Sequence, residues 1–541
     1  MGIKAGLDFG TTTSILSYLD GSTPREFYYG GYSGGGTPYV PSVVAYLDNE
    51  ILIGQHATQP QPPGASVYRY FKMLLPEADR DKWLSSYGPY ATEPQLVPAQ
   101  VTTDFIAELI TGDSPARRKQ GALRPNQAAF LQVQENPIEE LVVSAPQVWS
   151  HWKARGRQQL QIVVQELGLH LKQLISEPVA AAAYFTHRYR QKQGEAFRGN
   201  LLICDMGGGT FDVTLCKLSD NKVEVLCNAG NGVCGLGVAG AHFDHTLLTG
   251  KLGEVNDARV MAELLNKLDQ QKKDTNPTLL MRCLQRPSEI PITPIYAFAS
   301  ALEFGKAYTF NFADIEEAFD SVRQGIKEVL ARIKNEAGLR NYPIDKIVLV
   351  GGFSRFPLVQ QAVAEAFEED IFENARLIDL NTLRPDEMAF AISYGACLVA
   401  NDVVQISEKY DHTISALTYN SSGRAEDEEL ALITAGSSLD SLEAPAYCSW
   451  PNGEKRRFRF RKPSAEVNIV IRRDGSLSES QKISKRCSLT QIPGSDIAGN
   501  HWYLGVRVDA SKIPYLVVKD AQCETEKYYP LSDLVPHAGK S

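Results

Sequence analysis

Two short glycine-rich turns, far apart in the sequence, carry the residue types that bind a phosphate chain. The first turn contains Gly10, Thr11, Thr12 and Thr13, and the second contains Gly207, Gly208, Gly209 and Thr210. Backbone N–H groups can converge on a phosphate where small residues let the chain approach closely, and threonine hydroxyls add further donors. Either turn alone is equally well explained as a simple connection, but the pair predicts a two-sided clamp around a phosphate chain.

Aspartates flank both turns and are suited to a magnesium ion. Asp8 lies just before the first turn, and Asp205 and Asp212 lie on either side of the second. Mg²⁺ keeps much of its hydration shell in proteins, so the carboxylates that hold it often act through its waters. The sequence therefore predicts Asp8, Asp205 and Asp212 as metal-site residues that act mainly through water.

Each turn follows a short apolar segment that is typical of a buried strand. Ile3–Phe9 runs into the first turn, Leu201–Asp205 runs into the second, and Val213–Leu218 follows the second. A strand, a glycine-rich turn and an aspartate thus occur twice, which predicts two related lobes that face each other across a cleft. The expected fold class is α/β.

Helical patterns lie between and after these strands. Apolar residues at helical spacing predict an amphipathic helix within Trp149–Leu167. Glu177, Pro178 and the alanine run behind them predict a second helix that has the proline in its first turn. Ile315–Ala337 reads as a long third helix, and Ile347–Val350 reads as a further strand.

From about Asp411 the sequence changes to short apolar segments separated by Gly, Asn, Ser and Pro, which predicts a β-rich domain. Within it, Arg457-Phe458-Arg459-Phe460-Arg461 alternates strictly. A strand there would put the phenylalanines on one face and the arginines on the other. Two interpretations stay open: a half-buried strand with a solvated basic face, or a contact surface for a peptide or a nucleic acid.

The composition is that of a globular protein with several compact units. The chain has 541 residues, of which 43% are hydrophobic and 22% charged, and a formal net charge of -9. This length exceeds one hydrophobic core, and the negative charge disfavours a general attraction to nucleic acid or anionic membranes. The N-terminus has no signal-peptide pattern, and no stretch reaches the ~20 apolar residues of a membrane span. We expect a cytoplasmic protein with neither nucleic acid nor membrane as a partner.

Five segments, in the same order, resemble motifs of the 70-kDa heat-shock (DnaK-like) chaperone family. The two turns are similar to its two phosphate motifs, and Asp205–Asp212 is the closer match. The other three resemble the family's threonine-proline-serine stretch, its connecting motif and its adenosine motif, and lie at Thr37–Tyr46, Ser176–Ala182 and Val350–Pro357. The resemblance covers roughly residues 1–400.

This resemblance implies a two-lobed actin-like ATPase fold (ribonuclease H-like) followed by a small β-rich domain. The nucleotide-binding domain would span residues 1–400, with lobe I at about 1–198 and 375–400 and lobe II at about 199–374. Residues 401–411 would form a linker, and residues 412–541 a β-rich domain that binds a peptide or another partner.

The resemblance also implies roles for individual residues. Lys72, Glu177, Asp205 and Thr210 would be catalytic, with the lysine placed to within one position. Both turns would bind the nucleotide, together with a second group on its nucleoside side: Gly240, Glu303, Lys306, Gly351, Gly352, Phe353, Arg355 and Asp386. Arg355 would stack on or flank the base, and Glu177 would link the lobes with the metal waters.

Three departures from the family pattern affect these assignments. The helix that clamps adenine in the family is expected at Leu302–Tyr308, and the hairpin after it looks shortened. Phe353 stands where the family has a small polar residue, and Gly237–Asp244 lacks the usual glycine pair before Phe-Asp, although it keeps the aspartate. The linker motif at Asp402–Ile406 is weak, and no long helical lid is expected after the β-rich domain.

The function implied by the resemblance is an ATP-driven chaperone that couples nucleotide state to polypeptide binding. Its cofactors would be ATP or ADP and Mg²⁺, with K⁺ also allowed. Its partners would be unfolded or extended polypeptides, with a J-domain cochaperone and a nucleotide-exchange factor also allowed. Two alternatives stay open: a nucleotide-binding scaffold with little turnover, and an actin-fold kinase or filament-forming ATPase.

Overall fold

The structure is a computed structural model of the chain, and it divides into two compact units. The first unit comprises Met1–Val148 and Gln159–Ile406, and the second comprises Trp149–Gln158 and Ser407–Ser541. The structure describes residues 2–531 except for residues 30–35, 49, 60, 63, 78–95, 120–136, 151–153, 233–236, 254, 256, 275–276, 287–293, 374, 420–426, 451, 460–464 and 474–481.

One sheet of the first unit is built around β1 (Ile3–Asp8), the strand predicted before the first turn. Its strand order is β3-β2-β1-β8-β9, and β4 also pairs with β2. The bounds are β2 (Thr13–Asp20), β3 (Thr23–Glu26), β4 (Val40–Pro41), β8 (Ile138–Ala145) and β9 (Leu171–Ser176). β1 pairs antiparallel with β2 and parallel with β8, so the first turn is the connection of a hairpin at the carboxyl end of β1.

A second sheet repeats this plan around β10 (Gly199–Met206). Its order is β15-β10-β11-β12-β16, with bounds β11 (Phe211–Ser219), β12 (Lys222–Gly230), β15 (Lys346–Val350) and β16 (Gln405–Ser407). β10 pairs antiparallel with β11 and parallel with β15, just as β1 does with β2 and β8. The recurrence of strand, turn and aspartate therefore extends to the pairing of the strands, and the predicted strands are confirmed.

Two helices pack closely because small residues line their contact. α8 (Glu177–Gln193) and α14 (Pro385–Ala400) meet where a Cβ built on Gly395 would lie 1.7 Å from the carbonyl oxygen of Ala180. The alanine run at the start of α8 is fully buried there. α8 begins with its proline in the first turn, as predicted, and ends at Gly194 in the left-handed conformation.

The second sheet packs against a long helix, α12 (Phe312–Leu339), which confirms the helix predicted at Ile315–Ala337. Asn311 and Asp314 form a capping box at its N-terminus. Other helices of the first unit are α7 (Ala154–Glu166, from Gln159 onward in this unit), α9 (Gly240–Leu252), α10 (Ala258–Asp274), α11 (Pro277–Gln285), α13 (Pro357–Ala366) and the 3-10 turn η3 (Gly352–Arg355). The 3-10 turn η1 (Gln147–Ser150) contains residues of both units. Of the helices that the structure describes, none has the length and apolarity to span a membrane.

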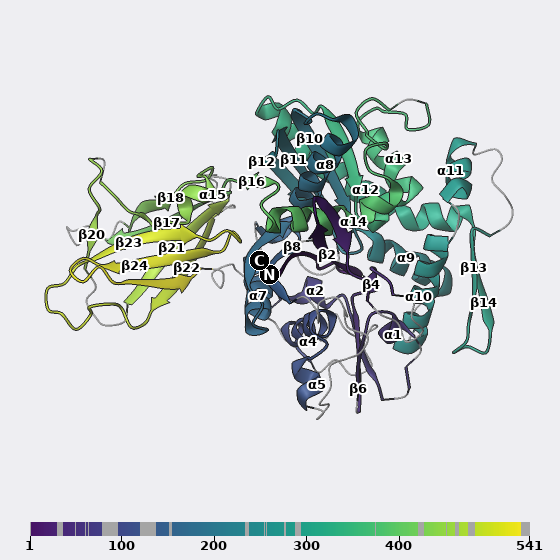
Figure 1. The fold of residues 1–541 in the computed structure, drawn as a ribbon, viewed down its shortest axis with the longest axis horizontal. Helices are drawn as coiled ribbons and strands as arrows, with labels where there is room; N and C mark the ends of the chain where they lie inside the picture. The colour runs from purple at the N-terminus through teal and green to yellow at the C-terminus, as the bar shows by residue number, and fades with distance from the viewer. Residues whose placement is uncertain are drawn as a thin grey trace. The chain divides into compact units, whose positions relative to one another are not determined.

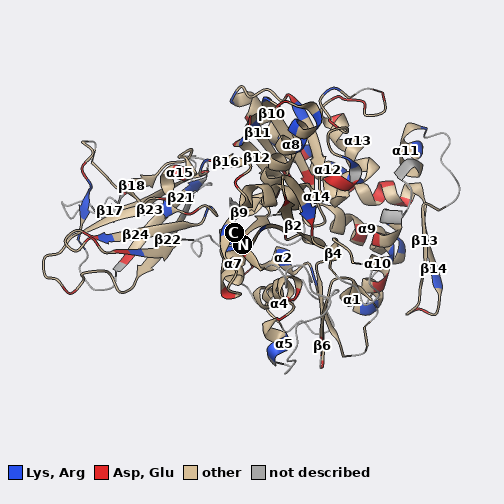
Figure 2. Ribbon diagram, viewed as in Figure 1, with Lys and Arg blue, Asp and Glu red and all other residues tan. Residues whose placement is uncertain are grey.

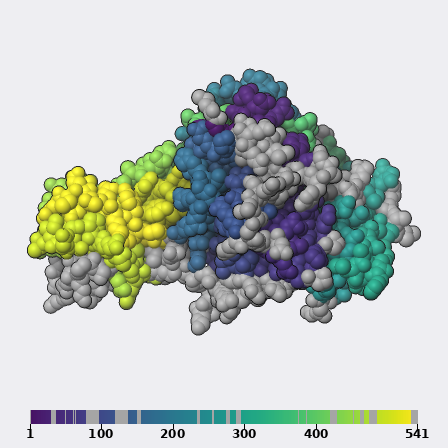
Figure 3. Space-filling model, turned by 60° about the horizontal axis from the view of Figure 1, so that its bottom comes forward, coloured from purple at the N-terminus to yellow at the C-terminus, as the bar shows by residue number. Residues whose placement is uncertain are grey.

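Residues 302–308 do not form the helix predicted there. They belong to an antiparallel hairpin of β13 (Tyr296–Ser300) and β14 (Lys306–Phe310). The prediction therefore places the hairpin too late in the sequence. Figure 1 shows the hairpin projecting at the edge of the first unit. In Figure 3, teal marks the part of the chain that contains α10, α11 and this hairpin.

The physical reason for this difference lies in the hairpin turn. Phe304 and Gly305 have left-handed backbone conformations, with φ of 56° and 83°, which suit a tight turn and do not fit a right-handed helix. Glu263 on α10 also holds the turn, because it accepts hydrogen bonds from the Ser300 hydroxyl at 2.6 Å and the Ala301 amide at 2.7 Å. This contact joins residues far apart in the sequence.

The first unit also contains a three-stranded sheet of order β6-β5-β7 and several short helices. The bounds are β5 (Val43–Leu47), β6 (Glu50–Ile53), β7 (Ser66–Arg69), α1 (Gln55–Thr58), α2 (Phe71–Leu74), α4 (Pro98–Ile110) and α5 (Pro115–Lys119). Helix α2 carries Lys72 and packs against α4.

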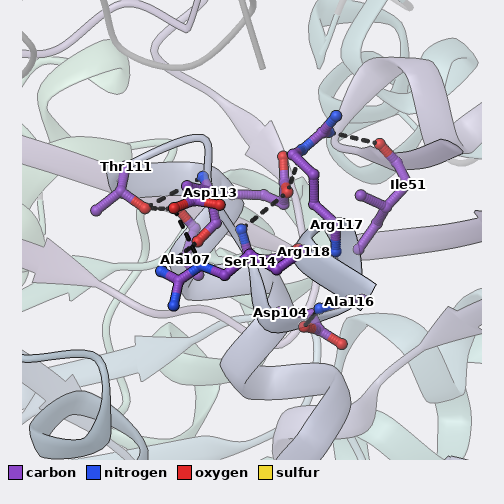
Figure 4. Close-up of polar contacts among 10 residues, drawn as sticks. Ile51, Asp104, Ala107, Thr111, Asp113, Ser114, Ala116, Arg117 and Arg118 are labelled. Atoms are coloured by element: carbon purple, nitrogen blue, oxygen red, sulfur yellow. Dashed lines mark hydrogen bonds and ion pairs between the residues drawn. The ribbon is translucent and has the colours of Figure 1, made fainter. Parts of the chain in front are cut away.

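Two buried acids on α4 fix the turn into α5 (Figure 4). Glu108 accepts two hydrogen bonds from the guanidinium of Arg117, at 2.7 and 2.9 Å. Asp104 accepts from the Ala116 amide and from the Tyr46 hydroxyl, both at 2.9 Å. Because these hydrogen bonds involve buried charged groups, they fasten α5 firmly to α4 and to the three-stranded sheet.

The second unit is β-rich, which confirms the prediction for the residues after Asp411 that the structure describes. One sheet has the order β18-β17-β21-β22, and the other has β19-β23-β24-β25 with β20 also paired to β23. Apolar side chains from both sheets form one core, as in a β-sandwich. The bounds are β17 (His412–Tyr419), β18 (Asp427–Ile433), α15 (Leu439–Leu442), β19 (Ala446–Tyr447), β20 (Arg457–Phe458), β21 (Ala465–Arg473), β22 (Lys482–Leu489), β23 (Trp502–Val508), β24 (Pro514–Asp520) and β25 (Glu526–Pro530).

An edge of the second sheet in this unit is interrupted. β19 and β20 pair with the same strand, β23, and the chain between them folds back on itself through a bridge between Ser449 and Lys455. We call residues 448–450 and 452–456 the edge hairpin. After it, Phe458 packs against the core while Arg457 and Arg459 are exposed, as the alternation predicts. Phe460 and Arg461 lie outside the described residues.

Candidate functional site

The two glycine-rich turns face each other. A Cβ built on Gly208 would lie 2.3 Å from Cγ2 of Thr12, and one built on Gly209 would lie 2.4 Å from Oγ1 of Thr11. These distances leave no room for a side chain at either glycine, so each turn is shaped around the other. The structure thus brings residues 10–12 together with residues 207–210.

The first turn is supported by a serine from the neighbouring segment. The Ser42 amide donates to the carbonyl of Thr12 at 2.9 Å, and its hydroxyl donates to the carbonyl of Gly10 at 2.7 Å. Ser42 lies within the stretch singled out at Thr37–Tyr46. Thr13, the last residue assigned to the first turn, already pairs with Pro41 in β4.

The second turn is supported through its own backbone carbonyls. Those of residues 207–209 accept hydrogen bonds from the amides of Gly240 at 3.2 Å, Ala241 at 2.8 Å and Gly237 at 2.6 Å. The turn therefore has a fixed conformation without help from a ligand, which lowers the entropic cost of binding. The hydrogen bond from its amide to the Gly207 carbonyl holds Gly240 beside the turn.

Three buried aspartates lie at the ends of the strands that carry the turns. Burial raises the pKa of Asp8 to about 7 and that of Asp212 to about 8, and the negative charge of Glu177 adds to the effect at both. Burial, with Glu177 and the other two aspartates, also raises the pKa of Asp205 well above its ordinary value. The Ser144 hydroxyl opposes the shift at Asp8 by donating a hydrogen bond of 2.9 Å. The aspartates therefore repel one another in a site that is short of positive charge.

Lys72 is buried against Glu177. The distance between Nζ and Oε1 is 2.5 Å, and the two side chains are 1% and 9% exposed. The ammonium also lies 5.5 Å from the ring centroid of Phe9. Its charge lowers the pKa of each of the three aspartates, so Lys72 lies within electrostatic reach of all of them.

The chemistry of this site fits a hydrated cation. Lys72 balances the charge of only one of four buried carboxylates. Among the residues that the structure describes, no three His, Cys, Asp or Glu side chains are arranged to ligate a metal directly. Asp8, Asp205 and Asp212 would therefore hold Mg²⁺ through its waters, and the ion would relieve their mutual repulsion.

Gly351 lets the segment after β15 approach the second turn. Its φ is 85°, and a Cβ built on it would lie 2.5 Å from Oδ1 of Asp205 and 2.6 Å from the carbonyl oxygen of Met206. The Ser354 hydroxyl accepts a hydrogen bond from the Met206 amide at 3.2 Å. The segment that contains Gly352, an exposed residue, is thus fixed at the carboxyl end of β10.

Phe353 belongs to an aromatic cluster beside the second turn. Its ring is stacked on that of Phe356 with 5.0 Å between centroids, and it lies 5.5 Å from that of Phe243. A Cβ built on Gly240 would lie 3.2 Å from Cγ of Phe353 and 3.1 Å from the carbonyl oxygen of Gly207. An aromatic side chain therefore borders the turn where the family pattern has a small polar one.

Lys272, which the motifs of the sequence do not single out, lies beside the aromatic cluster. Its ammonium on α10 lies 2.6 Å from both carboxylate oxygens of Asp244 and 5.5 Å from the ring centroid of Phe353. It thus brings a cation to the aromatic cluster. The sequence did offer one signal, because Lys272 lies near the C-terminal end of an amphipathic helix.

The structure separates Glu303 and Lys306 from this group. They pair with each other at 3.3 Å at the hairpin tip, which Figure 1 shows well away from β1 and β10. The prediction that a helix carries them is therefore wrong.

Arg355 and Asp386 are both exposed and share Tyr39 as a neighbour. Burial raises the pKa of Tyr39, the charge of Arg355 lowers it, and the charge of Asp386 raises it. These two charged residues therefore lie on the same side of the first unit. Their position agrees with a site bordered by η3 and the start of α14.

Comparison with known proteins identifies one family over most of the chain. A family model described as Hsp70 protein matches residues 122–411, which is more than half of the sequence. The chain is similar to the chaperone protein DnaK of Deinococcus radiodurans, at 25% identity over 552 residues that cover 96% of this chain and 77% of the relative. It is similar to that of Deinococcus deserti at 24% identity, with coverage of 96% and 77%, and to that of Deinococcus proteolyticus at 23% identity, with coverage of 91% and 73%. The chain therefore belongs to the Hsp70 protein family, and its fold is the two-lobed actin-like α/β domain followed by a β-rich domain.

Proposed function

We propose that this Hsp70 family member binds ATP between the two turns, hydrolyses it and couples the nucleotide state to polypeptide binding. Family membership and the likeness to DnaK proteins support a chaperone of the 70-kDa type. The observation that carries the finer proposal is the mutual fit of the two turns, in which Thr11 and Thr12 lie against Gly209 and Gly208. Two fixed sets of backbone and hydroxyl donors then converge on one phosphate chain.

In this proposal, two groups of residues bind the nucleotide. The phosphates are bound by the amides and hydroxyls of the turns, listed as Gly10, Thr11, Thr12, Thr13, Gly207, Gly208, Gly209 and Thr210. The nucleoside side is bordered by Gly240, Lys272, Gly351, Gly352, Phe353, Arg355 and Asp386. Phe353 and Lys272 replace the polar contacts of the family pattern with an aromatic face and a cation.

Hydrolysis needs mainly positioning and neutralisation of charge, because phosphoryl transfer to water involves little covalent work by the protein. Mg²⁺, held through water by the three aspartates, would neutralise charge on the phosphates. Lys72 is held by Glu177 at 2.5 Å and would stabilise charge that develops on the transferred group. Glu177, Asp205 and Thr210 would orient the attacking water.

The linker is the segment that would transmit a change in nucleotide state from the first unit to the second. Its strand, β16, extends the second sheet beside β12, with the Gln405 amide donating to the carbonyl of Asn221 at 2.9 Å. Lys172 on β9, in the first sheet, donates to Asp402 at 2.7 Å and to the Ala400 carbonyl at 3.1 Å. Because the linker contacts both sheets, a rotation of one sheet relative to the other would strain or release it.

We further assign the boundaries and surroundings that this function requires. Residues 1–400 act as the nucleotide-binding domain, residues 401–411 as the linker and residues 412–541 as the polypeptide-binding domain. The two sheets of the first unit serve as lobes I and II. The clients are extended polypeptides in the cytoplasm, and a J-domain cochaperone and an exchange factor would regulate turnover.

Single-turnover hydrolysis of radiolabelled ATP by the full chain tests this function. Lys72→Ala should lower the rate by about 100-fold or more, the usual effect of losing one preorganised charge-stabilising group. The variant should still bind ADP. Calorimetry with Mg²⁺, at a temperature where the variant is folded, measures this binding. Lys327→Ala, an exposed lysine on α12, serves as the control. Failure of both ATP and ADP to bind with Mg²⁺ would contradict the proposal.

A nucleotide-binding scaffold with little turnover is the second candidate function. Phe353 favours it, since an aromatic residue packed beside the second turn alters the nucleoside side of the site. Equal single-turnover rates for the wild type and Lys72→Ala, together with retained ADP binding, would support the scaffold and exclude the ATPase.

A further inference from the structure

One face of the second unit carries an unusual set of tyrosines. In the sheet β19-β23-β24-β25, alternate residues of each strand enter the core, and their neighbours face outward. The outward residues include four tyrosines, one from each strand: Tyr447, Tyr503, Tyr515 and Tyr528. None of the four belongs to the apolar core of the unit. We call this surface the tyrosine face.

Tyr447 lies across the middle of the tyrosine face because a glycine makes room for it. A Cβ built on Gly505 would lie 2.9 Å from Cδ1 of Tyr447, so a side chain there would displace the ring. The Tyr447 hydroxyl reaches β25, where it donates to Glu526 at 2.5 Å, and Tyr528 donates to the same carboxylate at 2.6 Å. Two rings are thus anchored by their hydroxyls.

Cations gather over these rings. Lys455 of the edge hairpin lies 4.5 Å from the ring centroid of Tyr447 and 5.7 Å from that of Tyr503. Arg507 lies 5.8 Å from the ring centroid of Tyr528. Arg457 is the cross-strand neighbour of Tyr503 and is exposed. Figure 2 shows Lys and Arg in blue along β20.

The edge hairpin adds an exposed indole to this surface. The Trp450 side chain is 48% exposed, and the guanidinium of Arg456 lies 4.3 Å from its ring centroid. Glu526 is already engaged by two tyrosine hydroxyls, and Asp509 accepts a hydrogen bond from Tyr515 at 3.4 Å. Lys519 on the same face lies 3.9 Å from both Glu524 and Glu526. Among the described residues, the face and the edge hairpin together carry six cations, Lys455, Arg456, Arg457, Arg459, Arg507 and Lys519, and four carboxylates, Glu454, Asp509, Glu524 and Glu526. The surface is therefore locally basic in a chain whose formal net charge is -9.

We propose that the tyrosine face and the edge hairpin bind single-stranded nucleic acid. Proteins that bind single strands combine cations that contact phosphates with aromatic rings on which bases stack. An acidic polypeptide would also contact the cations and the rings, but it carries no row of flat bases to stack on the rings. The net charge of the whole chain opposes general attraction to nucleic acid, so recognition depends on this local patch. The inference is independent of ATP binding by the first unit.

Fluorescence anisotropy of the full chain with labelled oligouridylate and oligothymidylate, each on the order of a dozen nucleotides, tests the proposal. We expect saturable binding that weakens as salt rises, because phosphate contacts release counterions. Binding to one oligonucleotide alone would assign the site to RNA or to DNA. Duplex DNA of equal length should bind more weakly, since its bases are not free to stack.

Two variants separate charge from stacking. Lys455→Glu with Arg457→Glu should weaken binding by about tenfold or more. Lys327→Glu on α12 with Arg340→Glu at its C-cap makes an equal change of charge at two exposed positions and should not weaken binding. Trp450→Leu, which keeps every charge, should weaken binding by about fivefold or more.

Three results would overturn the proposal. The first is that neither oligonucleotide binds at low salt. The second is that the two charge-reversal variants lose the same amount of affinity. The third is that polyglutamate competes as effectively as oligouridylate. The last result would identify an acidic polypeptide as the occupant. Circular dichroism of each variant establishes that the β-rich domain is folded.

Discussion

Lys72 and Glu177 form an ion pair that is almost completely buried. Their pairing places the ammonium near three aspartates with raised pKa values, so this one contact organises the charge of the site. We expect Lys72→Ala to lower the free energy of unfolding of the nucleotide-free protein by about 3–5 kcal/mol, because Glu177 then stays buried without its partner. Urea unfolding of the wild type and the variant measures this difference.

The double variant Lys72→Met with Glu177→Gln is the matched comparison. It removes both charges and nearly preserves the volume of each side chain, so it should recover most of the lost stability. A double variant as unstable as Lys72→Ala would show that packing around α2, rather than the unpaired carboxylate, sets the cost.

At the scale of elements, the contact between the two turns decides whether the phosphate site can form. Gly208→Ala would place a methyl group 2.3 Å from Cγ2 of Thr12, so the turns must move apart. We expect weaker ADP binding by calorimetry, by about tenfold or more, which corresponds to about 1.4 kcal/mol. Gly250→Ala in α9, where a Cβ meets nothing within 4 Å, should leave binding unchanged and stabilise the helix by about 0.5–1 kcal/mol. Unchanged affinity in Gly208→Ala would mean that the turns do not bind phosphate together.

A second element depends on a carboxylate. The segment after α13 adds to the edge of β15 through hydrogen bonds between residues 377–379 and Ile347, and Asp379 anchors it by accepting from Lys346 at 2.7 Å and from the Thr382 amide at 2.8 Å. Burial raises the pKa of Asp379, but these hydrogen bonds outweigh it and leave the pKa below its ordinary value.

A lowered pKa makes this contribution depend on pH. The stabilisation by Asp379 is complete above the unfolded-state pKa of about 4 and is lost as pH falls through the lower folded-state pKa. We expect Asp379→Asn to destabilise the protein by about 1–2 kcal/mol at neutral pH and by less and less below about pH 4. Thermal unfolding across this range provides the measurement, and a difference that stays constant with pH would contradict the role of the charge.

The sequence was informative about this site wherever local chemistry decides the structure. Glycines and threonines at strand ends predicted two matching units of strand and turn, and Pro178 predicted the start of α8. The sequence failed at residues 302–308, because Glu263 holds that hairpin turn across many residues of chain, although Gly305 was a local signal for a turn. Lys272 was missed for a related reason: only packing of α10 brings its charge to Phe353.

At the scale of the whole molecule, the linker strand is the point where nucleotide state would act. Val404 is 3% exposed in the first unit, next to the hydrogen bond that attaches β16. We expect Val404→Asp to release β16, because a buried unpaired charge is costly. Proteolysis within residues 401–411 should then be fast with or without ATP, and peptide binding should no longer respond to nucleotide.

Gln405→Glu is the control for this prediction. It adds the same charge at an exposed position of β16 and keeps the backbone hydrogen bond. It should therefore behave like the wild type in both the proteolysis and the peptide-binding measurement. Retained nucleotide response in Val404→Asp would show that coupling does not pass through this strand.

The broken edge of the tyrosine-bearing sheet also bears on aggregation. A long, uninterrupted edge strand offers a row of free amides and carbonyls on which another chain can add a strand. β19 and β20 each cover two residues of β23, and the segment between them carries Lys455 and Arg456 directly before Arg457 of β20. A neighbouring copy therefore meets short, charged fragments at this border, which disfavours the growth of ordered fibres from it.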